Sequence, residues 1–225
     1  MKRFRWLRAQ WPLPIRTLGK RLRATAFGPE VTHGFVIDRI RDDLLDGRYI
    51  ERIEFTETVM DPFGKELRFE RVEYRQSAFR ATAFGSGLEL RDPPRSVQPL
   101  MNQLSEAADF EVAITTQSVD VLAWAAHFQN IAQVSAVVES LQMNSLELEQ
   151  GITAKVVVRG ARDVRAACTS LTGGRKFTLE KVQLRLSKPV AGAIVLANTA
   201  SVTLGADDPS DELLEALRAA IPMAK

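Results

Sequence analysis

Apolar and polar residues alternate along several stretches of the chain, which is the period expected of strands that bury one face. The predicted strands are Tyr49–Val59, Leu67–Arg75, Ala78–Leu90, Phe110–Thr116, Leu146–Leu148, Ile152–Val158, Phe177–Leu186 and Val190–Leu204. Between the first two strands lies Asp61-Pro62-Phe63-Gly64, with proline at the second turn position and glycine at the fourth. This turn predicts a β-hairpin.

Other stretches place apolar residues three and four positions apart, the spacing of an amphipathic helix. The predicted helices are Val31–Asp46, Val97–Ala107, Ser118–His127, Ile131–Leu141, Ala161–Leu171 and a last helix opened by Asp208-Pro209. The chain of 225 residues is 45% hydrophobic and 26% charged, ordinary values for a packed protein. The pattern therefore predicts an α+β fold of mostly antiparallel twisted sheets with packed helices.

One sequence pattern occurs twice, at an offset of 110 residues. Phe69-Glu70-Arg71-Val72-Glu73-Tyr74-Arg75 matches Leu179-Glu180-Lys181-Val182-Gln183-Leu184-Arg185 in its order of apolar and charged residues. In both copies the apolar alternation skips one position before the valine, as a β-bulge would produce. The repeat fits two related halves, residues 30–143 and 144–225, and it also fits a chance likeness between amphipathic strands.

Basic residues are concentrated at the N-terminus. The whole chain has a net charge of +2, yet eight cations precede the first acidic residue, Glu30, and the rest of the chain has 22 basic and 28 acidic residues. Such segregation is typical of a tail that binds an anionic surface. We therefore divide the chain into an extended basic N-terminal arm, residues 1–29, and an α+β domain, residues 30–225.

Apolar and aromatic residues are interleaved with these cations. Phe4, Leu7 and Trp11 follow helical spacing, as do Ile15, Leu18 and Leu22. Tryptophan and arginine together suit a membrane interface or a protein groove, and the arm could instead cover the domain's own core. The candidate surface or partner-binding residues are Lys2, Arg3, Phe4, Arg5, Trp6, Arg8, Trp11, Arg16, Lys20, Arg21 and Arg23.

Motifs for catalysis are not found in the sequence. His33 and His127 are isolated, and Cys168 is the only cysteine, which predicts a buried helix position. Thr172-Gly173-Gly174-Arg175-Lys176 precedes a strand, so it predicts a hairpin turn in preference to a phosphate loop. We expect no enzyme activity, no catalytic residue, no cofactor and no metal site.

The sequence shows no transmembrane segment, because no stretch approaches the roughly 20 apolar residues that a spanning helix needs. It also shows no convincing signal peptide and no dedicated nucleic-acid recognition motif. The expected location is the cytoplasm, with peripheral membrane contact as a further option.

The strand pattern resembles the LmeA-like phospholipid-binding proteins of actinobacteria and cyanobacteria over roughly residues 31–205. The resemblance rests on Leu44–Ile53, on the repeated Phe69–Val72 and Leu179–Val182 strands, and on Phe110–Thr115 leading into the helix from Ser118. It implies an elongated β-rich fold with an apolar groove for acyl chains. Members often have a lipoprotein signal or membrane anchor, whereas this chain has the basic arm.

Two functional hypotheses follow. The first is a non-catalytic, peripheral binder of lipid or anionic membrane surfaces, with an apolar groove and a basic arm. The second is a structural linker or docking protein that inserts the arm among the acidic subunits of a larger assembly, such as a cyanobacterial light-harvesting antenna. The partners are therefore anionic lipid or acidic protein subunits.

Overall fold

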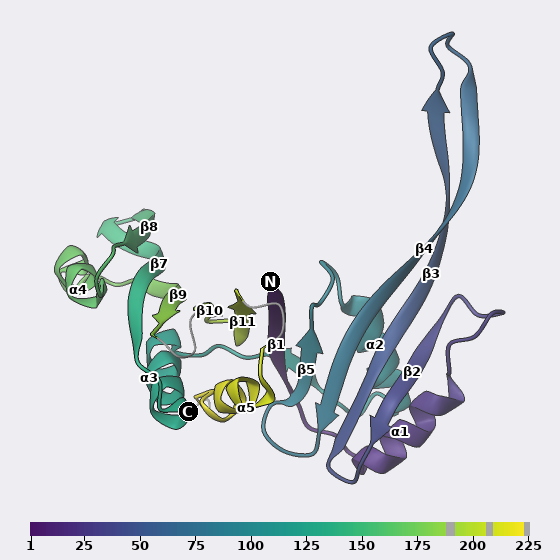
Figure 1. Cartoon of the computed structure of the whole chain (residues 1–225), viewed down its shortest axis with the longest axis horizontal. Helices are drawn as coiled ribbons and strands as arrows, with labels where there is room; N and C mark the ends of the chain where they lie inside the picture. The colour runs from purple at the N-terminus through teal and green to yellow at the C-terminus, as the bar shows by residue number, and fades with distance from the viewer. Residues whose placement is uncertain (188–191, 206–208, 223–225) are drawn as a thin grey trace. The chain divides into compact units, whose positions relative to one another are not determined.

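The computed structural model describes residues 1–187, 192–205 and 209–222, which form two compact units (Figure 1). We call Leu7–Thr115 the hairpin unit, and Met1–Trp6 together with Thr116–Lys225 the C-terminal unit. The boundaries fall inside strand β1 (Lys2–Ala9) and strand β6 (Ile114–Thr116). Neither boundary matches the predicted divisions. Residue 29 follows elements that belong to the folded units, and residue 143 lies inside strand β7 (Ala136–Glu149).

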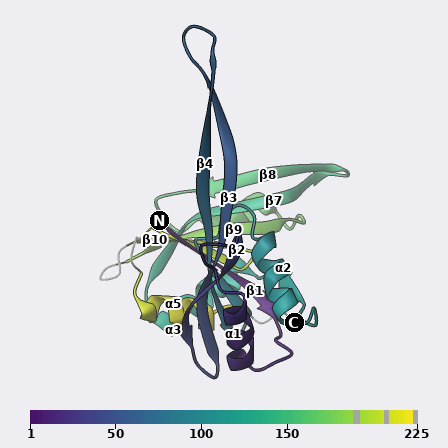
Figure 2. The ribbon, with the colours of Figure 1, turned by 90° about the vertical axis from the view of Figure 1, so that its right-hand side faces the viewer.

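The hairpin unit contains an antiparallel sheet in which strands follow one another in chain order. Its strands are β2 (His33–Ile40), β3 (Leu44–Met60), β4 (Glu66–Thr82) and β5 (Gly87–Arg91). Helices α1 (Ile15–Ala24) and α2 (Gln98–Ala107) contribute Leu18, Leu22, Leu100 and Leu104 to its core. Figures 1 and 2 both show β3 and β4 continuing well beyond these helices.

Close backbone contact fixes the end of β1 within the hairpin unit. The backbone N–H of Ala9 donates to the carbonyl oxygen of Ser86 at 2.8 Å. At the next residue, Gly87, a Cβ atom would lie 1.8 Å from the carbonyl oxygen of Ala9, and φ is +86°. Only glycine accepts both conditions.

The C-terminal unit contains a second antiparallel set of strands and three helices. Its order is β8–β7–β9–β10–β11 followed by the first residues of β1, with β8 at Ile152–Arg159, β9 at Thr178–Leu186, β10 at Gly192–Ala197 and β11 at Ser201–Leu204. The helices are α3 (Val121–Ala132), α4 (Arg165–Thr172) and α5 (Asp211–Ala219). Trp124 is central to this core: its indole N–H donates to the Leu217 carbonyl oxygen at 3.0 Å.

The predicted fold class is wrong in two respects: the proportion of strands to helices, and the extended N-terminal arm. Strands make up 47% of the structure and helices 23%, and the described residues contain five helices. The fold is therefore dominated by antiparallel sheet, and it is not an even mixture of sheets and packed helices. The predicted extended arm is replaced by β1 and α1, which are parts of the two units.

Two predicted helices are strands, and β-bulges explain both errors. In β2 the register passes from Ile37–Gly47 to Arg39–Asp46, so Asp38 is an extra residue. In β7 it passes from Val138–Leu184 to Ser140–Gln183, so Glu139 is an extra residue. An extra residue resets the side-chain alternation, and apolar positions then fall at spacings that imitate a helix. The predicted helix Val31–Asp46 contains the bulge residue Asp38, and the predicted helix Ile131–Leu141 contains the bulge residue Glu139.

The repeated pattern has the predicted bulge in one copy. In β9, Met143 pairs with Leu179 and Gln142 with Lys181, which leaves Glu180 as the extra residue. In β4 the register with β3 is unbroken from Leu44–Thr82 to Met60–Glu66. The last helix begins with Ser210 as its cap, whose Oγ accepts from the Leu213 N–H, while the predicted cap Asp208 lies outside the described residues.

Candidate binding surface

The apolar residues of the predicted arm belong to the cores of the two units. Phe4 and Trp6 alternate with exposed cations along β1 and are buried in the C-terminal unit, where Trp6 meets Trp124 edge to face at 5.7 Å between ring centroids. Residues 2–9 therefore form a strand, and the helical spacing predicted for Phe4, Leu7 and Trp11 is wrong. Lys2, Arg3 and Arg8 are exposed and Arg5 is half-buried.

The second part of the predicted arm forms α1, as its spacing predicts. Ile15, Leu18 and Leu22 are buried in the hairpin unit. Trp11, just before the helix, is half-buried and its indole N–H donates to the Gly87 carbonyl oxygen at 3.0 Å. These apolar side chains are committed to the fold, so the structure corrects the picture of an aromatic arm that is free to enter a partner.

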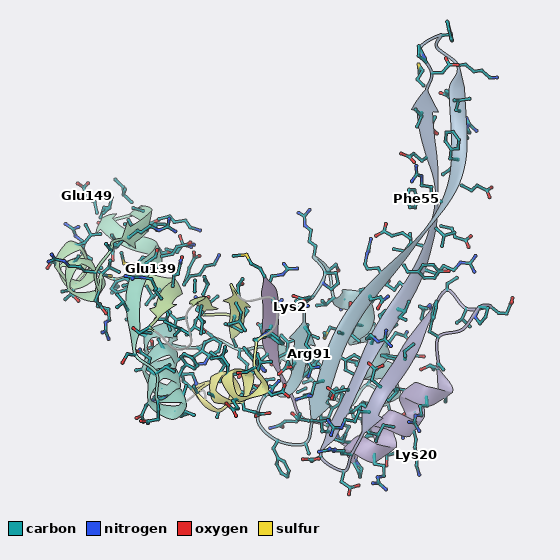
Figure 3. The ribbon with its side chains drawn as sticks, in the orientation of Figure 1. Lys2, Lys20, Phe55, Arg91, Glu139 and Glu149 are labelled. Carbon is teal, nitrogen blue, oxygen red and sulfur yellow. The ribbon has the colours of Figure 1, made fainter. Side chains whose placement is uncertain are left out.

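The cations of α1 remain at the surface. Arg16, Lys20 and Arg23 lie at positions i, i+4 and i+7 and form one line, which we call the basic stripe. Arg16 pairs with Asp42 at 2.9 Å, across two well-exposed side chains. Arg21 lies to one side, held at 2.5 Å by Asp109. Figure 3 shows Lys20 pointing outward from α1.

Most of the exposed large apolar residues of the hairpin unit lie on β3, on β4 or in the turn between them. His33 of β2 pairs with Glu51, and beyond the Arg52–Tyr74 pair the described strands include no further neighbour for either β3 or β4. We call this projecting part, residues 52–74, the ribbon. From the Arg52–Tyr74 pair to the turn it is about 30 Å long, at roughly 3.4 Å per residue.

One face of the ribbon continues the core-facing side of the sheet. Leu45 and Phe79 are buried on that side near α1, and the same alternation reaches Phe55 and Phe69, which are about half exposed. The apolar pattern thus extends beyond the helices that cover it. Figure 3 shows Phe55 on the projecting ribbon, away from both helices of the unit.

The end of the ribbon exposes large apolar residues on both faces and at the turn, beside the charged residues Asp61, Lys65 and Glu66. The exposed fractions are 45% for Val59, 65% for Met60, 94% for Phe63 and 37% for Leu67. We call these four residues the apolar tip. Val59 and Leu67 pair with each other on one face, Met60 lies on the other, and Phe63 occupies the turn. Soluble proteins rarely expose such a cluster unless it binds something.

The turn that carries Phe63 is rigid. One carboxylate oxygen of Asp61 accepts from the backbone N–H groups of Phe63 and Lys65, both at 2.8 Å. The Gly64 N–H donates to the Asp61 carbonyl oxygen at 3.0 Å, and Gly64 has φ of +83°. The predicted Asp61–Gly64 turn is confirmed, and its acidic side chain is used inside the turn.

Ion pairs begin at the tip itself and continue behind it. Glu66, which lies opposite Met60, pairs with Arg68 at 3.3 Å, and Arg71 pairs with Glu57 across the two strands. We call Glu57 and Arg71 the charged belt. Arg71 and Glu57 lie on different strands, whereas Arg52–Glu54 and Arg68–Glu66 are pairs within one strand.

A hollow lies in each of the two units. In the C-terminal unit, α3 and α5 enclose about 450 Å³, with walls that include Ile131, Val134 and Leu213. In the ribbon, about 460 Å³ lies beside Phe55 and Val72 with charged residues around them. The first hollow is the described feature nearest to an apolar groove, and its volume is within the range of small-molecule sites.

Cys168 and Asp163 of the C-terminal unit have shifted pKa values. Burial raises the pKa of the Cys168 thiol, which is close to the Met143 sulfur at 3.6 Å, so this cysteine is a buried helix residue as predicted. A hydrogen bond from Arg165 lowers the pKa of Asp163. Over the described residues, no cluster of three or more His, Cys, Asp or Glu side chains could hold a metal ion. Thr172–Lys176 spans the C-terminal end of α4 and the link to β9, so the predicted hairpin turn is wrong, and the segment is not at a helix N-terminus either.

None of the described helices combines the length and the apolar character needed to cross a membrane. Comparison with protein-family models and with curated proteins finds no match to this chain. The resemblance to LmeA-like proteins therefore stays a prediction.

Sequence reasoning missed the apolar tip. The signal was Phe63, a large aromatic residue inside a tight turn where no core can receive it. Phe55 and Phe69 lie in stretches whose alternation predicts strands, and alternation predicts which residues share a face but not whether anything covers that face.

Proposed function

We propose that this protein is a non-catalytic, peripheral membrane-binding protein that inserts the apolar tip of its β3–β4 hairpin into the bilayer interface. The carrying observation is the exposure of Phe63, Met60, Val59 and Leu67 around a rigid turn. Membrane contact was predicted through the basic arm; the tip takes the place of that arm in the proposal.

The height of the apolar tip fits interfacial insertion. The Glu57–Phe69 pair of the charged belt lies three residue pairs behind the Met60–Glu66 pair, about 10 Å at 3.4 Å per residue. Interfacial elements bury their apolar side roughly 5–10 Å into the boundary between headgroups and acyl chains. The belt would then lie at the level of the polar headgroups.

The nearby acidic groups have partners within the ribbon. Asp61 accepts two backbone hydrogen bonds within the turn, and Glu66 is paired with Arg68. Lys65 is the cation of the turn, and a lysine side chain can extend its ammonium group toward the headgroups.

The expected affinity is modest. Complete burial of one such side chain contributes about 1.5–3 kcal/mol, so four partly exposed residues supply roughly 5 kcal/mol. That is close to the contribution of one myristoyl chain, which gives weak and reversible membrane binding. The rigid turn reduces the entropy lost on insertion.

A bilayer explains the tip better than a protein partner does. A docking groove would contact one face of the ribbon, whereas the tip exposes apolar side chains on both faces and at its turn. The docking hypothesis also required charge complementarity with acidic subunits, but residues 51–75 have seven acidic and five basic side chains. Docking to protein remains the outcome if the vesicle test fails.

The test is flotation with neutral phosphatidylcholine vesicles. Wild-type protein should float with the vesicles, and Phe63→Asp should lose most of this binding because a carboxylate cannot enter the interface without a large cost. Phe84→Asp is the matched control, since Phe84 is 80% exposed in the same unit but lies outside the ribbon.

Salt separates insertion from charge attraction. Raising the salt to about 0.5 M should leave flotation on neutral vesicles unchanged. Failure of the wild-type protein to float, or equal loss of flotation in Phe63→Asp and Phe84→Asp, would refute insertion through the tip.

A further inference from the structure

The basic stripe lies at the opposite end of the hairpin unit from the apolar tip. α1 packs where β3 begins, since a Cβ at Gly19 would lie 3.3 Å from the Leu45 side chain. The tip is at the other end of β3, beside Met60. Fifteen residues at roughly 3.3 Å each separate the two by about 50 Å. Figures 1 and 2 agree on this placement from two directions.

The stripe has the character of a surface for anionic lipid. Helix α1 has no acidic residue, and the exposed Lys20 and Arg23 form no ion pair with any described side chain. Arg16 pairs with Asp42, which is itself highly exposed, so solvent screens that pair strongly. Clustered cations of this kind are attracted to phospholipid surfaces with negative charge.

A single flat bilayer does not satisfy both surfaces. With the tip inserted end-on, the stripe is about 50 Å away, far beyond the Debye length of roughly 8–10 Å at physiological salt. Laying the ribbon flat would instead press its excess of acidic side chains against anionic headgroups. The upright arrangement is the one that agrees with the charges of the ribbon.

We infer that the hairpin unit bridges two membranes. The apolar tip inserts into one bilayer, and Arg16, Lys20 and Arg23 bind the anionic phospholipid surface of another. This inference rests on the proposed function, because the bridge needs the inserted tip at one end.

The experiment compares binding and clustering on vesicles of two compositions. Neutral phosphatidylcholine vesicles should bind the protein without clustering, because they offer nothing to the stripe. Vesicles that also contain phosphatidylglycerol should cluster, as measured by light scattering. Salt of about 0.5 M should disperse the clusters while leaving flotation intact, since it screens the stripe only.

Charge reversal locates the second contact. Lys20→Glu combined with Arg23→Glu should abolish clustering and retain flotation on neutral vesicles. Arg175→Glu combined with Lys176→Glu is the matched control, with the same change of charge at two exposed residues of the C-terminal unit, and it should cluster vesicles like the wild type.

Failure of the bridge is distinguishable from failure of the insertion. Clustering by the Lys20→Glu/Arg23→Glu protein at the wild-type level would overturn the bridge, and so would clustering of neutral vesicles. Wild-type protein that floats with anionic vesicles but never clusters them would overturn it too. Insertion itself fails on neutral vesicles if the wild-type protein does not float, if Phe63→Asp floats like the wild type, or if Phe63→Asp and Phe84→Asp lose flotation equally.

Discussion

The two copies of the repeated pattern, one in β4 and one in β9, end in opposite environments. In β9, Val182 and Leu184 are fully buried; in β4, the equivalent Val72 and Tyr74 are 49% and 55% exposed. β9 lies between β7 and β10 and packs against α3. This part of β4 has β3 as its one neighbour among the described strands, with the ring of Phe27 against Tyr74. Equivalent side chains are therefore core in one unit and surface in the other because of their neighbours.

The largest expected difference comes from the same substitution at the two equivalent valines. Val182→Asp places a carboxylate in a closed core and should destabilise the C-terminal unit by more than about 4 kcal/mol. Val72→Asp on the ribbon should change stability by less than about 1 kcal/mol. Urea unfolding followed by the fluorescence of Trp6 and Trp124 measures the first, because both belong to that core.

Similar losses from the two substitutions would break the comparison. It would mean that the ribbon is covered in solution, or that β9 is less enclosed than its neighbours indicate. The far-UV circular dichroism of both variants serves as the control for folding.

A smaller effect compares the covered and projecting parts of one hairpin. The chain has two tyrosines, Tyr49 and Tyr74, both on this hairpin. Burial, with a further contribution from Glu51, raises the pKa of Tyr49 to about 12. Because the folded state holds this proton more tightly, its contribution is complete below the unfolded pKa near 10 and is lost as pH rises toward 12.

The expected loss is about 2–3 kcal/mol of stability in the hairpin unit between pH 10 and 12. Tyr49→Phe should remove this pH dependence. In a Tyr74→Phe protein, the ultraviolet absorbance of tyrosinate should rise only near pH 12. Ionisation of Tyr49 near pH 10 in the folded protein would show that its environment is open to water.

Much of the local structure could be predicted from the sequence. The Asp61–Gly64 turn, the hairpin around it and the apolar spacing of α1 follow from local preferences, and the structure confirms them. The helices predicted across Asp38 and Glu139 are strands. A single bulge residue in each strand changes the apparent period of its apolar residues.

The candidate site was the harder problem. Charge segregation indicated the N-terminal cations, and three of them form the basic stripe, but burial of Phe4 and Trp6 depends on partners up to two hundred residues away in the chain. The exposure of Phe55 and Phe69 depends on how far along the sheet the packing of α1 extends. Neither long-range fact is contained in a local pattern.

Phe63 offers the most direct test of insertion. A cysteine replaces Phe63 in one protein and Phe84 in another, both with Cys168→Ala, and each carries a dye whose emission shifts to the blue in apolar surroundings. With neutral phosphatidylcholine vesicles, the dye at position 63 should shift to the blue and the dye at position 84 should not. No shift at position 63, or equal shifts at both, would contradict insertion of the apolar tip.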